Sequence, residues 1–249
     1  MKPRVAFFDF TSCEGCQLDA LNLEPEELLG LLGAVDIVNF REVKTDRSDD
    51  YDIAFIEGSI TRESEILRLQ TIRNQAKVLV ALGACACTGG INCIKDAYAM
   101  EELLEGVYGN CASYYDTIPA QPVDAVVMVD AYIRGCPPTT EEFMKVVKAM
   151  LLGKKPDIPN YPVCTECRRA GNVCVFQRGG TCIGPVTRAG CEALCVSAGR
   201  FCWGCRGLVD DPNTGSEKDI LARYGLTVDQ ILEHFRIYNS CAEAAKCQK

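Results

Sequence analysis

The sequence predicts an α/β protein with a parallel, flavodoxin-like sheet, followed by a smaller cysteine-rich region with little regular structure. Short apolar runs alternate with helical patterns over the first 150 residues, and this alternation is typical of a parallel sheet covered by helices on both faces. Three prolines, a glycine and two lysines gather in residues 153–162, which indicates a linker. We therefore expect one domain at residues 1–155 and a second at residues 156–249.

The predicted elements follow in chain order. Leucines at helical spacing predict a helix over Leu18–Leu32, and Pro137 and Pro138 suit the first turn of a helix over Thr139–Leu152. A helix is also expected over Arg62–Asn74, and the last periodic segment is Asp219–Tyr238. Five short apolar runs predict strands: Arg4–Phe10, Val35–Phe40, Asp52–Ile56, Lys77–Leu82 and Val123–Val129.

Composition excludes several classes of protein. Hydrophobic residues make up 48% and charged residues 24% of the 249 residues, which is ordinary for a globular chain. A net charge of −8 without a long run of one sign argues against a nucleic-acid partner. His234 is the one histidine, so a site that needs two histidines is excluded.

The N-terminal sequence and the cysteine count together predict a compartment. The first apolar stretch is short and is interrupted by Asp9, unlike a secretory signal, and no apolar run approaches the roughly 20 residues that span a bilayer. We therefore expect a cytoplasmic protein without a membrane span. Thiols stay reduced in that compartment, so 17 cysteines predict metal or redox chemistry.

Four cysteines follow the ends of predicted strands. Cys13 and Cys16 come after the first strand, Cys85 after Lys77–Leu82, and Cys136 after Val123–Val129. The carboxyl ends of parallel strands share one edge of the sheet, where α/β proteins bind ligands. Four thiolates there would suit an iron–sulfur cluster, with the N-termini of the following helices facing its negative charge. A thioredoxin-like pair, Cys13 and Cys16, is the alternative, but it leaves the other two cysteines without a role.

Eight further cysteines form a second group, and their number matches two four-thiolate sites. They are Cys164, Cys167, Cys174, Cys182, Cys191, Cys195, Cys202 and Cys205. Structural zinc would use the same ligands, so spacing alone leaves that alternative open. Six arginines among these cysteines could offset the charge of clusters or simply form an exposed surface: Arg168, Arg169, Arg178, Arg188, Arg200 and Arg206.

Five cysteines lie outside these groups. We expect Cys93, Cys111, Cys241 and Cys247 to be free thiols that pack as small apolar side chains. The role of Cys87 is ambiguous, because it lies two residues from Cys85 and would point to the opposite side of an extended strand end.

Five motifs resemble one known family: "TSCEGCQL", "IAFIEGSI", "VALGACACTGGI", "YIRGCPP" and "CIGPVTRAGC". Over roughly residues 4–210 the chain resembles the small, electron-transferring subunit of nickel–iron hydrogenases, of the cytoplasmic sulfhydrogenase and NAD(P)-linked type. The resemblance implies three 4Fe-4S clusters. Their ligands would be Cys13, Cys16, Cys85 and Cys136 (proximal), Cys164, Cys167, Cys174 and Cys182 (distal), and Cys191, Cys195, Cys202 and Cys205 (medial).

The resemblance also implies partners and marks one departure. The nickel–iron centre would belong to a separate large subunit, so this chain would not activate hydrogen alone, and a further flavin or iron–sulfur subunit would exchange electrons with it. Many relatives hold the distal cluster with one histidine, whereas Cys164 occupies the matching position here, so that site is expected to be all-cysteine. The rival functions are a complex I-type subunit, a ferredoxin-like carrier and a zinc-stabilised interaction protein.

Overall fold

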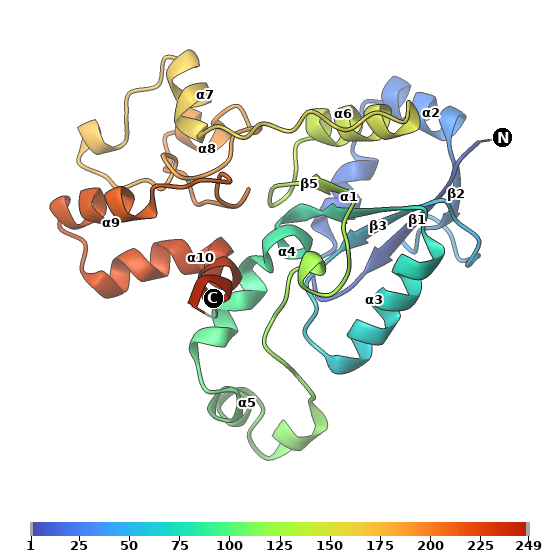
Figure 1. The fold of residues 1–249 in the computed structure, drawn as a ribbon, viewed down its shortest axis with the longest axis horizontal. Helices are drawn as coiled ribbons and strands as arrows, with labels where there is room; N and C mark the ends of the chain where they lie inside the picture. The colour runs from blue at the N-terminus through green and yellow to red at the C-terminus, as the bar shows by residue number, and fades with distance from the viewer. Residues whose placement is uncertain (1, 248–249) are drawn as a thin grey trace.

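A five-stranded, all-parallel sheet forms the first part of the molecule (Figure 1). The computed structural model describes residues 2–247. The strands lie in the order β2-β1-β3-β4-β5, which is the flavodoxin-like order with its switch point between β1 and β3. Their bounds are β1 Arg4–Asp9, β2 Asp36–Asn39, β3 Ile53–Glu57, β4 Val78–Leu82 and β5 Ala131–Ile133. The predicted fold class is therefore confirmed.

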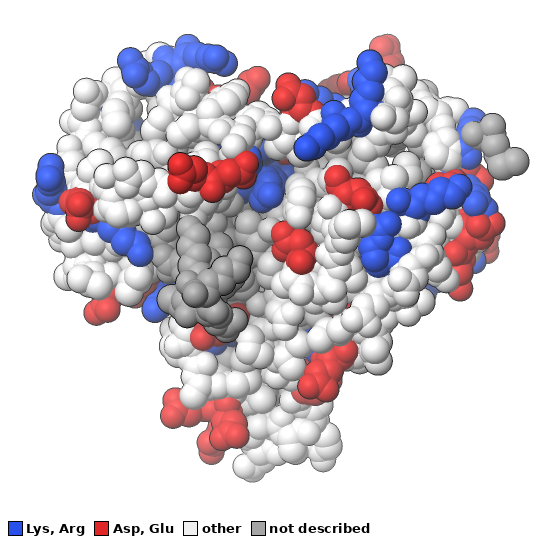
Figure 2. Space-filling view, in the orientation of Figure 1, with Lys and Arg blue, Asp and Glu red and all other residues white. Residues whose placement is uncertain are grey.

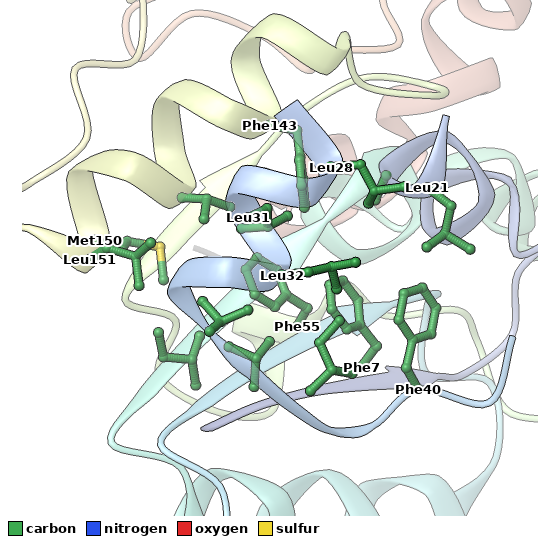
Figure 3. Close-up of a pocket in the computed structure, with 16 residues that line it drawn as sticks. Phe7, Leu21, Leu28, Leu31, Leu32, Phe40, Phe55, Phe143, Met150 and Leu151 are labelled. Atoms are coloured by element: carbon green, nitrogen blue, oxygen red, sulfur yellow. The ribbon is translucent and has the colours of Figure 1, made fainter. Parts of the chain in front are cut away.

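One face of the sheet is covered by α1 (Gly15–Leu21), α2 (Pro25–Ala34) and α6 (Thr140–Leu151). Phe7 of β1 stacks against Phe40 and Phe55, at ring-centroid distances of 4.3 and 4.7 Å. Leucines of α1 and α2 cover these rings (Figure 3). The small cavity of about 30 Å³ between them has an apolar lining, so it is a packing defect of the core.

The opposite face is covered by α3 (Glu63–Gln75), α4 (Gly83–Thr88) and the 3₁₀ turn η3 (Val123–Ala125). Leu69 and Ile72 of α3 pack on the sheet residues Ile56 and Leu79. Because both faces are covered, the central strands are apolar along most of their length, as expected for a parallel sheet.

The predicted helix over Leu18–Leu32 is wrong in one respect, because the segment forms two helices. Pro25 begins α2, and Glu24 before it is extended, with φ −55° and ψ 141°. A proline disfavours the helical conformation of the preceding residue, so the leucine pattern is interrupted there.

The predicted strand over Val123–Val129 is also wrong. Pro122 leads into η3, whose backbone is tied by hydrogen bonds from Ala125 and Val126 to the carbonyls of Pro122 and Val123. Met128 is 72% exposed, so the valine run does not enter the sheet. The fifth strand is instead Ala131–Ile133, which pairs with Val80–Leu82 and still precedes Cys136.

A lobe projects from the sheet domain between β4 and η3. It consists of η1 (Gly90–Ala97), α5 (Met100–Tyr108) and η2 (Gly109–Tyr114). The lobe shows acidic side chains in the space-filling view, whereas basic and acidic side chains intermingle over the rest of that face (Figure 2).

The cysteine-rich part contains short helices. They are α7 (Val163–Arg169), η4 (Phe176–Arg178), α8 (Leu194–Ser197), α9 (Thr214–Arg223) and α10 (Val228–Cys247). The periodic segment Asp219–Tyr238 is thus two helices, separated at Gly225, whose φ of 87° suits glycine. The apolar clusters of the cysteine-rich part are small, so something other than a large hydrophobic core must stabilise it. Between Leu151 and Val163 no helix or strand forms, and the domain boundary at residue 155 stays a prediction.

Helix α10 returns to the first part of the molecule. It packs against η1 and α4, and a disulfide joins Cys93 of η1 to Cys241 of α10. The expectation that both would be free thiols is therefore wrong. The two residues are 148 positions apart, so no local pattern reveals the pairing. Among the residues that the structure describes, no helix has both the length and the apolarity to cross a bilayer.

Candidate metal centres

The first thiol set lies where β1, β4 and β5 end. Cys16 lies in the first turn of α1, Cys85 lies in α4, and Cys136 lies in the loop after β5. Burial raises the pKa of Cys16, and the nearby Glu57, Cys85 and Cys136 raise it further. Burial raises the pKa of Cys85 to about 12, with further contributions from Cys136 and Cys13. The four predicted residues are thus brought together.

Glycines let the backbone approach the sulfur atoms of this set closely. Gly83 has φ +83°, and a Cβ there would overlap the Cys16 sulfur. A Cβ on Gly90, with φ +58°, would lie 2.9 Å from Sγ of Cys85. The Ala84 amide donates to the Gly135 carbonyl at 2.6 Å, which joins the Cys85 and Cys136 loops.

Glu57 supports this set and was not predicted. It ends β3, is 1% exposed, and accepts hydrogen bonds from the amides of Cys16 and Gln17, both at 3.0 Å. A carboxylate on the first amides of a helix fixes the position of its first turn. The sequence contained a hint of this role, because Glu57 is a charged residue directly after the apolar run Ile53–Ile56, at the edge of the sheet where ligands bind.

The second set is formed by Cys164 and Cys167 of α7 with Cys174 and Cys182. Burial, together with the nearby Cys182, Cys167 and Cys174 thiols, raises the pKa of Cys164 to about 12. These are the four residues that the resemblance assigns to the distal set, and that assignment stays a prediction.

The third set adjoins the first two. Burial, together with the nearby Cys191, Cys136 and Cys195 thiols, raises the pKa of Cys205 to about 12. Burial raises the pKa of Cys202 as well, with Cys182 and Cys205 as further causes. The Cys202 amide donates to Sγ of Cys182 at 3.3 Å. The thiol sets therefore form a continuous series from the sheet edge into the cysteine-rich part.

The raised thiol pKa values indicate which chemistry these sets can perform. A redox-active CxxC pair works through a lowered thiol pKa, whereas the pKa of Cys16 is shifted upward. Buried thiols with a raised pKa, such as those of Cys16 and Cys85, become thiolates only when a cation compensates their charge. The four sulfur donors, with glycines packed beside them, therefore fit a bound metal or an iron–sulfur cluster.

Four of the six arginines among the cysteines lie on the exposed surface, and two are buried. Arg168, Arg169, Arg178 and Arg200 are exposed, whereas Arg206 is 1% and Arg188 is 7% exposed. Arg188 pairs with Asp210.

The other thiols and the histidine lie outside the sets. Cys87 is buried in α4, and its thiol donates to the carbonyls of Ala81 and Ile133 at the strand ends. Cys111 is exposed, so the prediction that it packs as a buried side chain is wrong. His234 contacts the Gln230 carbonyl through Nδ1. The side chain of Cys247 lies outside the described residues.

Tyr238 of α10 is a further residue that the sequence did not indicate. Burial raises the pKa of its phenol, and the Cys136 thiol, to which it hydrogen-bonds, raises it further. Cys205 and Cys85 also raise the pKa of Tyr238, so this residue lies between the first and third sets.

A buried acid beside the second set provides a pH-dependent prediction. Glu217 of α9 is 2% exposed, burial raises its pKa to about 7, and Oε1 has no hydrogen-bond partner among the described residues. The folded state thus binds this proton more tightly than the unfolded state, so stability falls as the pH rises from the ordinary value of 4.5 to about 7. The free energy of unfolding of the Glu217→Gln variant should therefore lose up to about 3 kcal/mol less over this pH range.

Melting curves of the anaerobic protein at pH 5 and pH 8 would measure this. The Gln variant should gain melting temperature over the natural protein mainly at pH 8. Glu105→Gln, at an exposed position on α5, is the matched control. An equal gain at both pH values would show that the Glu217 charge is not the cause.

The flavodoxin-like sheet and the adjoining thiol sets define a cysteine-rich α/β protein. Comparison with known proteins identifies its family. A family model described as NADH ubiquinone oxidoreductase, 20 Kd subunit, matches residues 13–150. The chain belongs to this family. The match begins at Cys13 and includes the whole first thiol set, but it ends before the second.

Curated relatives extend the similarity through the cysteine-rich part. The chain is 34% identical over 242 residues to a subunit of the F420-non-reducing hydrogenase vhu of Methanococcus voltae, covering 84% of each chain. It is also 34% identical to the sulfhydrogenase 2 subunit delta of Pyrococcus furiosus, covering 88% of this chain and 92% of the relative. A chain of an NAD⁺-reducing [NiFe]-hydrogenase crystal structure superimposes with a TM-score of 0.58 and 27% identity, over 64% of this chain and 96% of that one.

Proposed function

We propose that this chain is the electron-transfer subunit of a nickel–iron hydrogenase, which relays electrons between the nickel–iron site of a large subunit and an electron-accepting subunit. The observation that carries the proposal is the continuous series of twelve cysteines in three adjoining sets. An iron–sulfur cluster bound by each set would supply one-electron transfer.

Each set has a proposed role. Cys13, Cys16, Cys85 and Cys136 hold the proximal 4Fe-4S cluster. Cys191, Cys195, Cys202 and Cys205 hold the medial cluster, and Cys164, Cys167, Cys174 and Cys182 hold the distal one. Glu57 keeps Cys16 in place through the first amides of α1, and the phenol of Tyr238 lies beside the Cys136 thiol.

A complex I-type function is the second candidate, and the family description favours it. That match covers the sheet domain alone, whereas the hydrogenase subunits align over most of both chains. The eight cysteines from Cys164 to Cys205 would hold two further clusters in an electron relay, whereas a subunit with the first set alone would not need them. This supports the hydrogenase function.

The arrangement also supports the proposed partners. Cys13 and Cys136 are exposed at the sheet edge although they belong to the first set. A thiolate-bound cluster there needs cover from water, and a large subunit that docks on this edge would provide it. The second set lies at the other end of the series, where a flavin or iron–sulfur subunit would accept electrons. We retain the cytoplasm as the proposed location.

Iron analysis tests the proposal. Anaerobically purified protein should be brown and contain about 12 iron atoms per chain, four for each cluster. It should co-purify with a nickel-containing large subunit when expressed in its natural host. A colourless preparation rich in zinc would contradict the proposal, and an iron-loaded chain without a nickel-containing partner would favour the carrier or complex I-type functions.

A further inference from the structure

A buried ion pair joins the two parts of the molecule between the first and third thiol sets. Arg206 follows Cys205 directly, and its partner Glu142 lies on α6 of the sheet domain. Their side chains are 1% and 6% exposed. Removing two charges from water is costly, so a pair this deep needs further hydrogen bonds and is weak evidence for a gain in stability.

Arg206 lies in the Cys205 loop, and its hydrogen bonds reach two other cysteine-bearing loops and helix α6. Nη1 donates to the Arg134 carbonyl at 2.6 Å, two residues before Cys136. Nε donates to the Ala189 carbonyl at 2.7 Å, two residues before Cys191. Nη2 donates to Oε2 of Glu142. The guanidinium is rigid and planar, so it holds these groups at fixed directions.

Glu142 completes the connection from the other side. Its Oε1 accepts from the Arg134 amide at 3.0 Å, so both the amide and the carbonyl of Arg134 are bound by the pair. Thr139 caps α6 by accepting from the Glu142 amide at 3.2 Å, which fixes the backbone of Glu142.

Gly190 leaves the space that the pair occupies. It has φ +118°, and a Cβ there would overlap Nη2 of Arg206 and lie 2.7 Å from Oε2 of Glu142. The Gly190 amide donates to Oε1 of Glu166 at 2.7 Å, beside Cys167. The loop before Cys191 is therefore tied to the first set through Arg206 and to the second through Glu166.

We infer that Arg206 and Glu142 are positioning residues that fix the distance and orientation between the first and third thiol sets. The inference rests on the proposed function, since the spacing of these sets matters for electron exchange. Electron exchange between two centres falls steeply with their separation. A pair that ties the Cys136, Cys191 and Cys205 loops together therefore sets the rate of the step between the two centres through their relative position.

Arg206→Lys tests this in the complete complex with its partner subunits. Lysine keeps the positive charge but cannot bond three acceptors in one plane. Three quantities should be measured: iron per chain, the spin–spin interaction between reduced proximal and medial clusters by electron paramagnetic resonance, and hydrogen-driven acceptor reduction. We expect unchanged iron, an altered interaction splitting, and a rate lowered by about tenfold or more. Arg223→Lys, at an exposed position on α9, should change none of them.

Glu142→Gln provides a second variant. It keeps the size of the side chain but removes the charge, and it should alter the same splitting with iron retained. Unchanged splitting in both iron-loaded variants would overturn the inference. Loss of iron from both would also overturn it, because the pair would then be purely structural. A natural protein without interacting clusters would instead count against the proposed function.

Discussion

Cys167→Ser is expected to remove the distal cluster and to lower hydrogen-driven reduction of the acceptor by more than about 100-fold. Cys167 lies in α7, and its thiol raises the pKa of both Cys164 and Cys182. Iron should fall from about 12 to about 8 atoms per chain, since one cluster of four is lost. The proximal and medial spectra should persist, and so should hydrogen–deuterium exchange at the nickel site of the partner, because that reaction needs no outward electron transfer.

The same substitution at Cys111 is the matched control, because this thiol is exposed and belongs to no set. Cys111→Ser should retain all iron and full activity. A Cys167→Ser protein that loses the medial signal and keeps the distal one would show that the eight cysteines are divided differently. The amide of Cys202 contacts the Cys182 sulfur, so the boundary between these two sets is the one that the experiment tests most closely.

Leu69→Ala should be the most damaging substitution on α3. Leu69 is 0% exposed and packs on the sheet, and removing a buried leucine side chain costs about 2–5 kcal/mol in stability. For a chain of this length the melting temperature should fall by about 10 °C. Differential scanning calorimetry of the anaerobic protein measures this.

Leu67 provides an internal comparison two residues away on the same helix. It is 68% exposed, so the identical change to alanine should shift stability by less than about 0.5 kcal/mol. Equal effects at Leu67 and Leu69 would mean that α3 does not pack on the sheet as described.

The sheet and its binding edge could be predicted because those features repeat locally. A parallel strand leaves an apolar run, and the residue after the run must lie at the carboxyl edge, so the pattern of the sequence is enough to place Cys13 and Cys85. Cys136 was placed correctly although its strand was wrong. Both the valine run and the true strand, Ala131–Ile133, precede the loop that carries Cys136. The 3₁₀ turn after Pro122 and the exposure of Met128 show that the valine run itself is not the strand.

Contacts between distant residues could not be predicted in this way. Arg206 and Glu142 are 64 positions apart, and the disulfide partners Cys93 and Cys241 are 148 apart. In each case a single residue carries no periodic signal, and its partner is chosen by how the two parts of the molecule pack. Glu57 is intermediate, since its position after a strand was visible but its bonds to the α1 amides were not.

The return of α10 to the sheet domain has a consequence for the order in which the molecule is assembled. A chain grows from its N-terminus, and its first domain can fold while the rest is still being made. The first thiol set is complete once Cys136 has been added, whereas Tyr238 and the rest of α10 are added only after the whole cysteine-rich part. The side of the set that Tyr238 covers in the finished protein is therefore open throughout that interval. Under the proposed function, iron and sulfide can reach the first thiol set from that side before α10 arrives and closes it.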